Sequence, residues 1–179
     1  SMTSIIKVNN IKDSANNQAI AINNGVVTFS NPPIGDNAGK VLQVVSNIST
    51  TGTGHVTTPT AALAVSITPS ATSSKVFVIA MGAGSVIWGS NGVLQAEIRR
   101  GTISGSMIAC SYIGLSGSGP ANGNEHYFTP VVTVTDSPST TSSQTYTFAV
   151  TKGSGGTTSA RIMGGSSFPI TMTAMEIGV

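Results

Sequence analysis

The sequence contains very little charge. Only 8% of its 179 residues are Asp, Glu, Lys or Arg, against roughly 25% in an ordinary globular chain. The eight basic residues exceed the six acidic ones by two, and they are scattered, with only Arg99 and Arg100 adjacent. Because a nucleic-acid-binding surface needs a dense basic patch, we expect no nucleic-acid partner.

Cysteine and long apolar runs are also scarce. Cys110 is the only cysteine, which excludes an intrachain disulfide framework. Its apolar neighbours predict a small buried strand residue rather than a nucleophile. No stretch reaches the ~18 consecutive apolar residues of a membrane span, so no membrane insertion is expected. The N-terminus lacks the apolar core of a signal peptide, and we expect synthesis without a leader from Met2.

Gly, Ser, Thr and β-branched apolar residues stand where the charges are missing. These residues favour strands and turns, whereas exposed helix faces are usually rich in Glu, Lys, Gln and Arg. With 39% hydrophobic residues, the chain is too apolar and too weakly charged to be intrinsically disordered. The composition therefore predicts an all-β fold.

The chain is predicted to divide near the stiff connector Asn31-Pro32-Pro33. Residues 1–38 carry short strand patterns and a strong hairpin signal at Asn23-Asn24-Gly25. They contain too few apolar residues to form a core alone, so this segment needs a partner surface. Residues 39–179 form the second, larger part.

Residues 39–179 show a regular series of short strands separated by Gly, Pro, Asn, Ser and Thr clusters, as in a β-sandwich or barrel. Strict alternation in "QTYTFAV" predicts one buried face. "KVFVIAMGAG" and "ITMTAMEIGV" are apolar on both faces, which predicts strands buried on both sides or lying at a subunit interface. The predicted strands are 40–47, 62–68, 75–83, 92–100, 107–113, 126–135, 144–151, 159–163 and 169–177.

Candidate catalytic groups are few. Glu97 can pair with Arg99 on the same strand face, whereas the neighbours Glu125 and His126 point to opposite faces of a strand. A metal site normally needs three or more protein ligands, and no spacing links His55 to the Glu125 pair. No G-x-S-x-G elbow marks out a serine. We expect no catalytic residue, no metal and no cofactor.

The remaining acidic residues of the larger part are assigned structural roles. In "DSPSTTSSQTYTF" the side chains of Asp136 and Ser137 are predicted to bond the backbone just ahead, and Pro138 fixes φ. The stretch is then a connection between two strands at a barrel edge. Glu176 is interpreted, like Glu97, as a solvated or interface ion-pair partner.

Three segments together resemble a known family. "AVSITPSATSSKVFVIAMGAG" looks like an early barrel strand, a Ser/Thr turn and a central strand, and "VTVTDSPSTTSSQTYTFAV" looks like its later counterpart. "ITMTAMEIG" resembles a closing strand. In this order they resemble the C-terminal domains of bacteriophage fibre-type proteins, such as tail fibres, head fibres and spikes. The segment "IIKVNNIKDSANNQAIAINNGVVTFS" is similar to the β-rich segments that open many such proteins.

The resemblance implies a jelly-roll β-sandwich of TNF/C1q-like architecture at residues 39–179, preceded by a β-rich shaft or virion-attachment segment at residues 1–38. It also implies a homotrimer, and the low charge and doubly apolar strands favour one independently. In such a trimer, strands 75–83 and 169–177 could bury their apolar faces along the three-fold axis.

The function implied is that of a virion structural protein on the particle surface. The N-terminal segment would contact another virion protein, and the distal loops would bind a host glycan or protein. The alternatives are a capsid decoration or attachment protein with a purely structural role, and a polysaccharide depolymerase, which would need paired carboxylates. The expected receptor-binding residues are Trp88, Asn91, Ser116, Ser118, Asn122, Asn124, Glu125, His126 and Tyr127.

Overall fold

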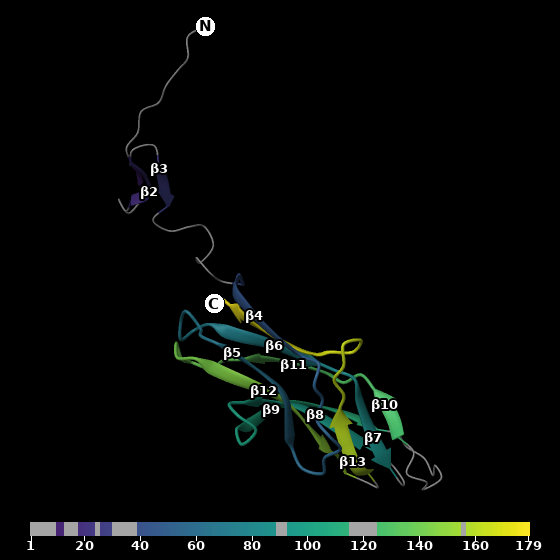
Figure 1. The fold of residues 1–179 in the computed structure, drawn as a ribbon. Coiled ribbons are helices and arrows are strands. Elements are labelled where there is room, and N and C mark those ends of the chain that lie inside the picture. The colour runs from purple at the N-terminus through teal and green to yellow at the C-terminus, as the bar shows by residue number, and fades with distance from the viewer. Residues whose placement is uncertain are drawn as a thin grey trace. The chain divides into compact units, whose positions relative to one another are not determined.

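The structure is a computed structural model in which the chain forms two compact units, Ser1–Ala38 and Gly39–Val179 (Figure 1). In the first unit, β1 (Asn10–Lys12), β2 (Gln18–Asn23) and β3 (Val26–Phe29) form an antiparallel sheet in that order. Among the described residues, no helix is long and apolar enough to cross a membrane. The described residues are 10–12, 18–23, 26–29, 39–88, 93–114, 125–154 and 157–179.

Two four-stranded antiparallel sheets form the body of the larger unit. The first has the order β11-β6-β14-β4, with β4 (Val41–Ser49), β6 (Lys75–Met81), β11 (Val131–Asp136) and β14 (Ile170–Ile177). The second has the order β5-β12-β8-β9, with β5 (Thr60–Ile67), β8 (Val93–Arg100), β9 (Ser106–Gly114) and β12 (Gln144–Lys152). The chain crosses repeatedly between the sheets, which is the jelly-roll arrangement. The predicted all-β jelly-roll sandwich is confirmed.

A third sheet, β10-β7-β13, prolongs the first sheet with the same neighbour order. Its strands are β7 (Gly84–Trp88), β10 (Glu125–Phe128) and β13 (Thr157–Ile162). The single strand predicted over 126–135 is wrong, because Pro130 has no N–H for the ladder and interrupts it. The strand predicted over 75–83 ends at Met81, and β7 was not predicted.

The core lies between the two layers and consists of alternate residues of each strand. Val76, Val78 and Ala80 of β6 are fully buried there, opposite Tyr146 and Phe148 of β12. Burying a Val or Phe side chain of this kind stabilises the fold by about 1.5–3 kcal/mol. The alternation seen in the sequence of β12 therefore does mark a core-facing side.

The outer face of the second sheet differs from its prediction. Glu97 was interpreted as a solvated or interface ion-pair partner of Arg99. The pairing is confirmed, with Arg99 Nε 2.7 Å from Glu97 Oε1, but the Glu97 side chain is fully buried rather than solvated. Cys110, predicted to be buried, is exposed. Cys110 is the register partner of Glu97 on β9, and the alternation of the strand turns it away from the core. The apolar neighbours of Cys110 in sequence gave the wrong face.

A polar clamp joins the two sheets at the end of β11. The Asp136 carboxylate accepts hydrogen bonds from Arg100 Nε at 2.8 Å and from Arg100 Nη2, and Tyr146 donates its hydroxyl to Oδ2 at 2.8 Å. The predicted bond from Asp136 to the backbone just ahead is therefore wrong. Ser139, in the connection that follows, has a positive φ of 54°, which is uncommon for a residue other than glycine.

Candidate functional site

Polar side chains gather on the face of the sheet β10-β7-β13 that points away from the core. Ser85 is the register partner of both Tyr127 and Arg161, and partners in an antiparallel pair share a face. The opposite face belongs to the core, where Val86 and Ala160 are buried. The set is called the Glu125 cluster below and comprises His55, Ser85, Glu125, Tyr127, Ser159 and Arg161.

Glu125 is the centre of this cluster. Its Oε1 accepts a hydrogen bond from the Ser85 hydroxyl and lies 2.7 Å from Arg161 Nη2, while Tyr127 donates to Oε2 at 3.2 Å. The Ser85 hydrogen bond is the largest influence that lowers the pKa of Glu125. Arg161, Tyr127 and His55 add to it, and partial burial opposes them. The carboxylate is therefore ionised at neutral pH.

His55 joins the cluster from a distant part of the chain. Its Nε2 lies 3.3 Å from Glu125 Oε1 and its Nδ1 lies 3.2 Å from the Ser159 hydroxyl. The position is set by backbone pairing, since Thr53 N–H donates to the Ile162 carbonyl at 2.8 Å and Val56 pairs with Ala160. No spacing in the sequence links His55 to Glu125, and it is the backbone pairing with β13 that brings their side chains together.

The order Ser159–His55–Glu125 is that of a nucleophile, a base and an orienting carboxylate. Glu125, however, is already neutralised by Arg161, which weakens its support for a charged imidazole. Glycoside hydrolysis needs two carboxyl groups flanking one bond. The described acidic groups Glu97, Asp136 and Glu176 each belong to separate networks. Among the described residues there is no group of three His, Cys, Asp or Glu that could hold a metal ion.

What the cluster does offer is an exposed aromatic ring beside charged and polar groups. Tyr127 is 62% exposed, and an exposed phenol ring offers an apolar face together with a polar hydroxyl group. Around it stand the Glu125 carboxylate, the Arg161 guanidinium and the His55 imidazole. Such a mixture of donors, acceptors and one aromatic ring suits a ligand rich in hydroxyl groups.

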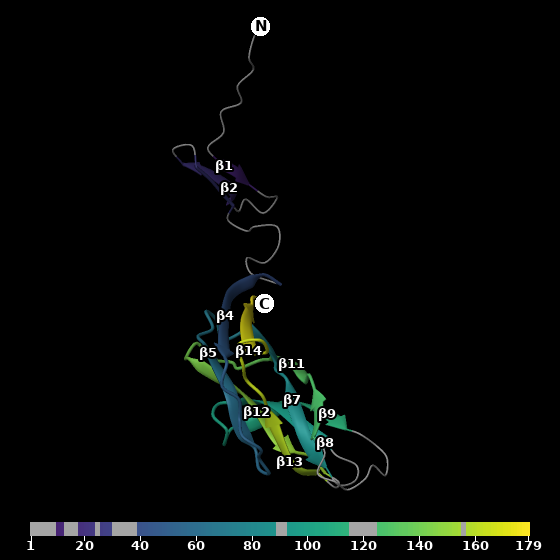
Figure 2. The same cartoon turned by 45° about the vertical axis from the view of Figure 1, so that its right-hand side comes forward.

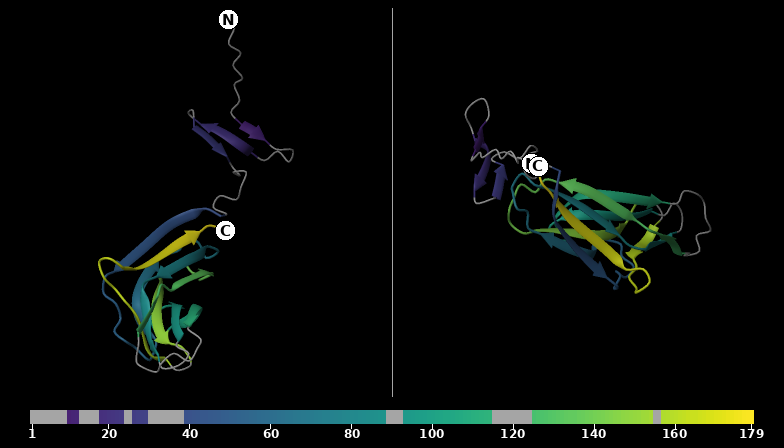
Figure 3. Two further views of the ribbon diagram at one scale, coloured as in Figure 1. Left: turned by 90° about the vertical axis from the view of Figure 1, so that its right-hand side faces the viewer. Right: turned by 90° about the horizontal axis from the view of Figure 1, so that it is seen from above.

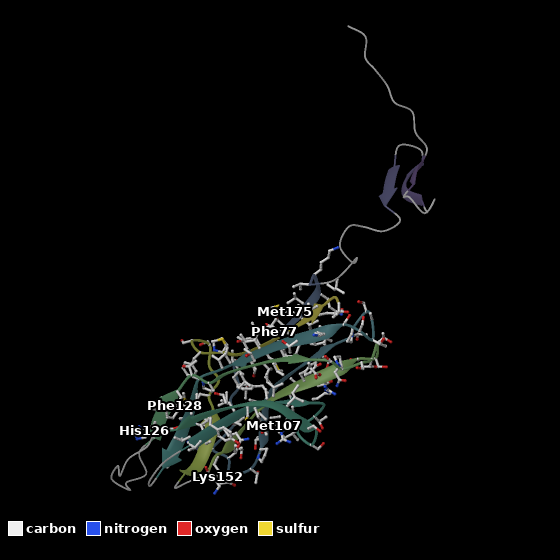
Figure 4. All side chains as sticks on the ribbon, turned by 180° about the vertical axis from the view of Figure 1, so that it is seen from behind. Phe77, Met107, His126, Phe128, Lys152 and Met175 are labelled. Atoms are coloured by element: carbon white, nitrogen blue, oxygen red, sulfur yellow. The ribbon has the colours of Figure 1, made fainter. Side chains whose placement is uncertain are left out.

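The structure brings two of the predicted receptor-binding residues together and separates a third. Glu125 and Tyr127 share the cluster, while His126 lies on the opposite side of β10, half-buried, with Val86 as its register partner (Figure 4). The side chain of Trp88 and the following predicted residues lie outside the described part of the structure: Asn91, Ser116, Ser118, Asn122 and Asn124. Sequence reasoning missed His55, Ser85, Ser159 and Arg161.

A hollow of about 410 Å³ adjoins the cluster and shares Arg161 with it. Its floor is made where two glycine backbones pack against each other. A Cβ on Gly52 would lie 2.4 Å from the Ile162 carbonyl oxygen, and one on Gly164 would lie 2.5 Å from the Gly52 nitrogen. These two glycines therefore hold the segment that carries His55 close to β13.

We expect Gly52→Ala to destabilise the jelly roll by about 1–3 kcal/mol, because the new methyl group has to push two backbones apart. Gly54→Ala is the matched control, since a Cβ there meets nothing within 4 Å. Denaturant unfolding of both variants measures the difference. Equal stability of the two variants would show that the close approach at Gly52 does not constrain the fold.

Fold and cluster together define a jelly-roll β-sandwich with a polar site on an extension of one sheet. No protein-family model matches the sequence, and no curated protein matches it. Among solved structures, the chain is similar to the VP2 protein of infectious bursal disease virus. A mutant in T=1 particles has 13% identity and a TM-score of 0.32, covering 89% of this chain and 40% of that one.

Two further structures of the same virus are similar to a comparable degree. The Gx strain shows 14% identity with a TM-score of 0.32, covering 88% of this chain and 42% of that chain. The Gt strain shows 12% identity with a TM-score of 0.33, covering 90% and 47%. The chain thus spans less than half the length of these proteins, and likeness at this level says nothing about its function.

Proposed function

We propose that this chain is a structural protein of a bacteriophage virion. In this proposal it is a homotrimeric fibre or spike that presents one end of its jelly roll to a host cell-surface glycan or protein. The N-terminal unit is proposed to attach it to another virion protein at the particle surface. The segment resemblance to phage fibre-type proteins supports the class, and the jelly-roll topology of residues 39–179 agrees with it.

The observation that carries the proposal is the polarity of the jelly roll. Its first and last residues meet at one end, where Gly39 N–H donates to the Gly178 carbonyl at 2.7 Å and Gly178 N–H donates to the Lys40 carbonyl at 2.9 Å. The strands β7, β10 and β13, labelled in Figure 1, lie at the other end, which Figures 2 and 3 show from further sides. A jelly roll connected at one end leaves the opposite end, with the Glu125 cluster, available for contact.

Tyr127 is the described residue best suited to that contact, with the loop residues predicted from the sequence around it. A sugar ring can stack on its exposed phenol while Glu125 and Arg161 exchange hydrogen bonds with hydroxyl groups. The purely structural alternative, a decoration or attachment protein, assigns no ligand to this end. Enzymatic depolymerisation is not part of the proposal, and a reducing-sugar assay on host polysaccharide would detect it.

We expect Tyr127→Ala to weaken binding of the purified protein to host cells by about tenfold or more, as loss of a central aromatic contact does. Tyr112→Ala is the matched control, because Tyr112 is 60% exposed but lies on β9 of the other sheet. Binding of fluorescently labelled protein to candidate bacterial hosts, and to a glycan array, gives the measurement.

Two results would count against the recognition role. Equal loss of binding in the Tyr112 and Tyr127 variants would show that the Glu125 cluster is not the specific contact surface. Absence of binding by the wild-type protein to every candidate host would leave the decoration role in its place.

A further inference from the structure

The outer face of the sheet β11-β6-β14-β4 carries apolar side chains from all four strands, interspersed with Ser and Thr. Residues paired in antiparallel register point to the same side, and the side opposite Val76, Val78 and Ala80 is the outer one. Phe77 and Met175 are neighbours there (Figure 4). The apolar face is defined by three rows: Val44–Met175–Phe77–Thr135, Ser46–Thr173–Ile79–Thr133 and Ile48–Thr171–Met81–Val131.

Much of this face lies in water in the isolated chain. Ile48 is 63% exposed, Val44 55%, Val131 44% and Met81 40%. Phe168, 47% exposed, extends the face across an apolar hollow of about 290 Å³ that it shares with Met81. Together these side chains expose on the order of 400 Å² of apolar surface, which is within the size range of the largest, often functional, apolar patch of a monomer.

The outer face of the other sheet has a charged network on β8, while its exposed Met107 and Tyr112 lie on the edge strand β9. Glu97 is fully buried beneath Arg99 and Gln95, which donate to its carboxylate. Thr147 and Thr151 beside it are also buried. None of the residues in the three rows of the apolar face is charged, and the Ser46 and Thr173 hydroxyls, 2.9 Å apart, form the polar contact among these described side chains. The two sheets therefore differ in the charge that their outer faces carry.

We infer that the apolar face is covered by further copies of this chain in the assembled protein. This inference rests on the proposed homotrimer and names its interface. An uncharged face does not repel its own copy, whereas a charged partner surface would lose hydration here without gaining an ion pair. A standard interface buries roughly 800 Å² per partner, of which somewhat over half is apolar. The roughly 400 Å² of exposed apolar surface on this face is close to the apolar part of such an interface.

The test places charge on the face at positions where the fold tolerates it. In Val44→Glu/Ile48→Glu both replaced side chains are more than half exposed, so the single chain can still fold, while assembly would bury unpaired carboxylates. The matched control is Met107→Glu/Tyr112→Glu, at positions 45% and 60% exposed on β9 of the other sheet. Far-ultraviolet circular dichroism confirms that each variant is folded.

Size-exclusion chromatography with light scattering at micromolar concentration measures the result. We expect the wild type and the control at three times the 18.0 kDa mass of one chain, and the Val44/Ile48 variant at one. A wild-type mass of 18.0 kDa overturns the inference, and so does an oligomer that the Val44/Ile48 variant leaves intact. If the wild-type protein is a trimer but does not bind host cells, the recognition role is contradicted and the inferred interface is not.

Discussion

Replacing Asp136 with Ala is expected to lower the free energy of unfolding by about 3 kcal/mol, because it breaks the clamp between the two sheets. The carboxylate is only 7% exposed and accepts hydrogen bonds from Arg100 and Tyr146. Removing it leaves the fully buried Tyr146 hydroxyl without its described partner, and a buried unpaired polar group costs about 1–3 kcal/mol by itself. It also removes the ion pair that holds Arg100 of β8 to the end of β11.

The protonation states of the clamp support this expectation. Burial is the largest cause that raises the pKa of Tyr146, and the hydrogen bond to Asp136 raises it further. The hydrogen bond with Asp136 likewise raises the pKa of Arg100. Tyr146 therefore stays a neutral donor and Arg100 a cation, so the clamp persists through the neutral range.

Tyr146→Phe separates the two parts of the clamp. It removes one hydroxyl, keeps the ring in the core and leaves the Arg100–Asp136 pair in place, so a loss of only about 1 kcal/mol is expected. Unfolding in denaturant is compared at one protein concentration, because assembly would stabilise the folded state. If Asp136→Ala changed the free energy of unfolding by less than about 0.5 kcal/mol, the clamp would not contribute to stability as expected.

Much of the fold was predictable because alternating or continuously apolar strand patterns, bounded by turn residues, are visible within single segments. These patterns located β6, β8, β12 and β14 to within two residues of their observed ends, and the jelly roll followed from segment resemblance. The division of the strand predicted over 126–135 and the presence of β7 were not foreseen. Pro130 interrupts that strand, and β7 begins at Gly84, just beyond the end of the strand predicted over 75–83.

The site was predictable only where it lies on one strand. Glu125 and Tyr127 are two residues apart and share a face, but His55 and Arg161 reach them through strand register, which a single sequence does not display. Burial was misjudged for the same kind of reason. Alternation shows on which side of a strand Glu97 stands, but not that Arg99 and Gln95 close over it.

Replacing Glu176 with Gln is expected to destabilise the protein at neutral pH by about 3 kcal/mol, because a carboxylate with a matched set of donors is lost. Glu176 is 1% exposed at the end of the core. Its Oε1 accepts from the Ser70 backbone N–H at 2.7 Å and from the Ser70 and Ser74 hydroxyls at 2.6 Å. Gln43 Nε2 donates to Oε2 at 2.7 Å. The ion pair predicted for Glu176 is replaced by these neutral donors.

The loss should depend on pH in a defined direction. Burial alone raises the pKa of Glu176, but the hydrogen bonds from Ser70, Ser74 and Gln43 outweigh it and lower the pKa from 4.5 to about 2. A depressed folded-state pKa gives stability that is fully present above the unfolded pKa and is lost as pH falls through the folded one. The difference between wild type and Glu176→Gln should therefore be constant above about pH 5 and shrink toward pH 2.

Denaturant unfolding of both proteins between pH 7 and pH 2 measures this difference. Ser74→Ala serves as the intermediate case, because it removes one donor, raises the folded-state pKa and moves the loss of stability to higher pH. If the gap between wild type and Glu176→Gln stayed unchanged down to pH 2, its source would be the shape of the side chain rather than its charge. The connection between β5 and β6 would then be held by packing, and the hydroxyl groups of Ser70 and Ser74 would have no electrostatic role.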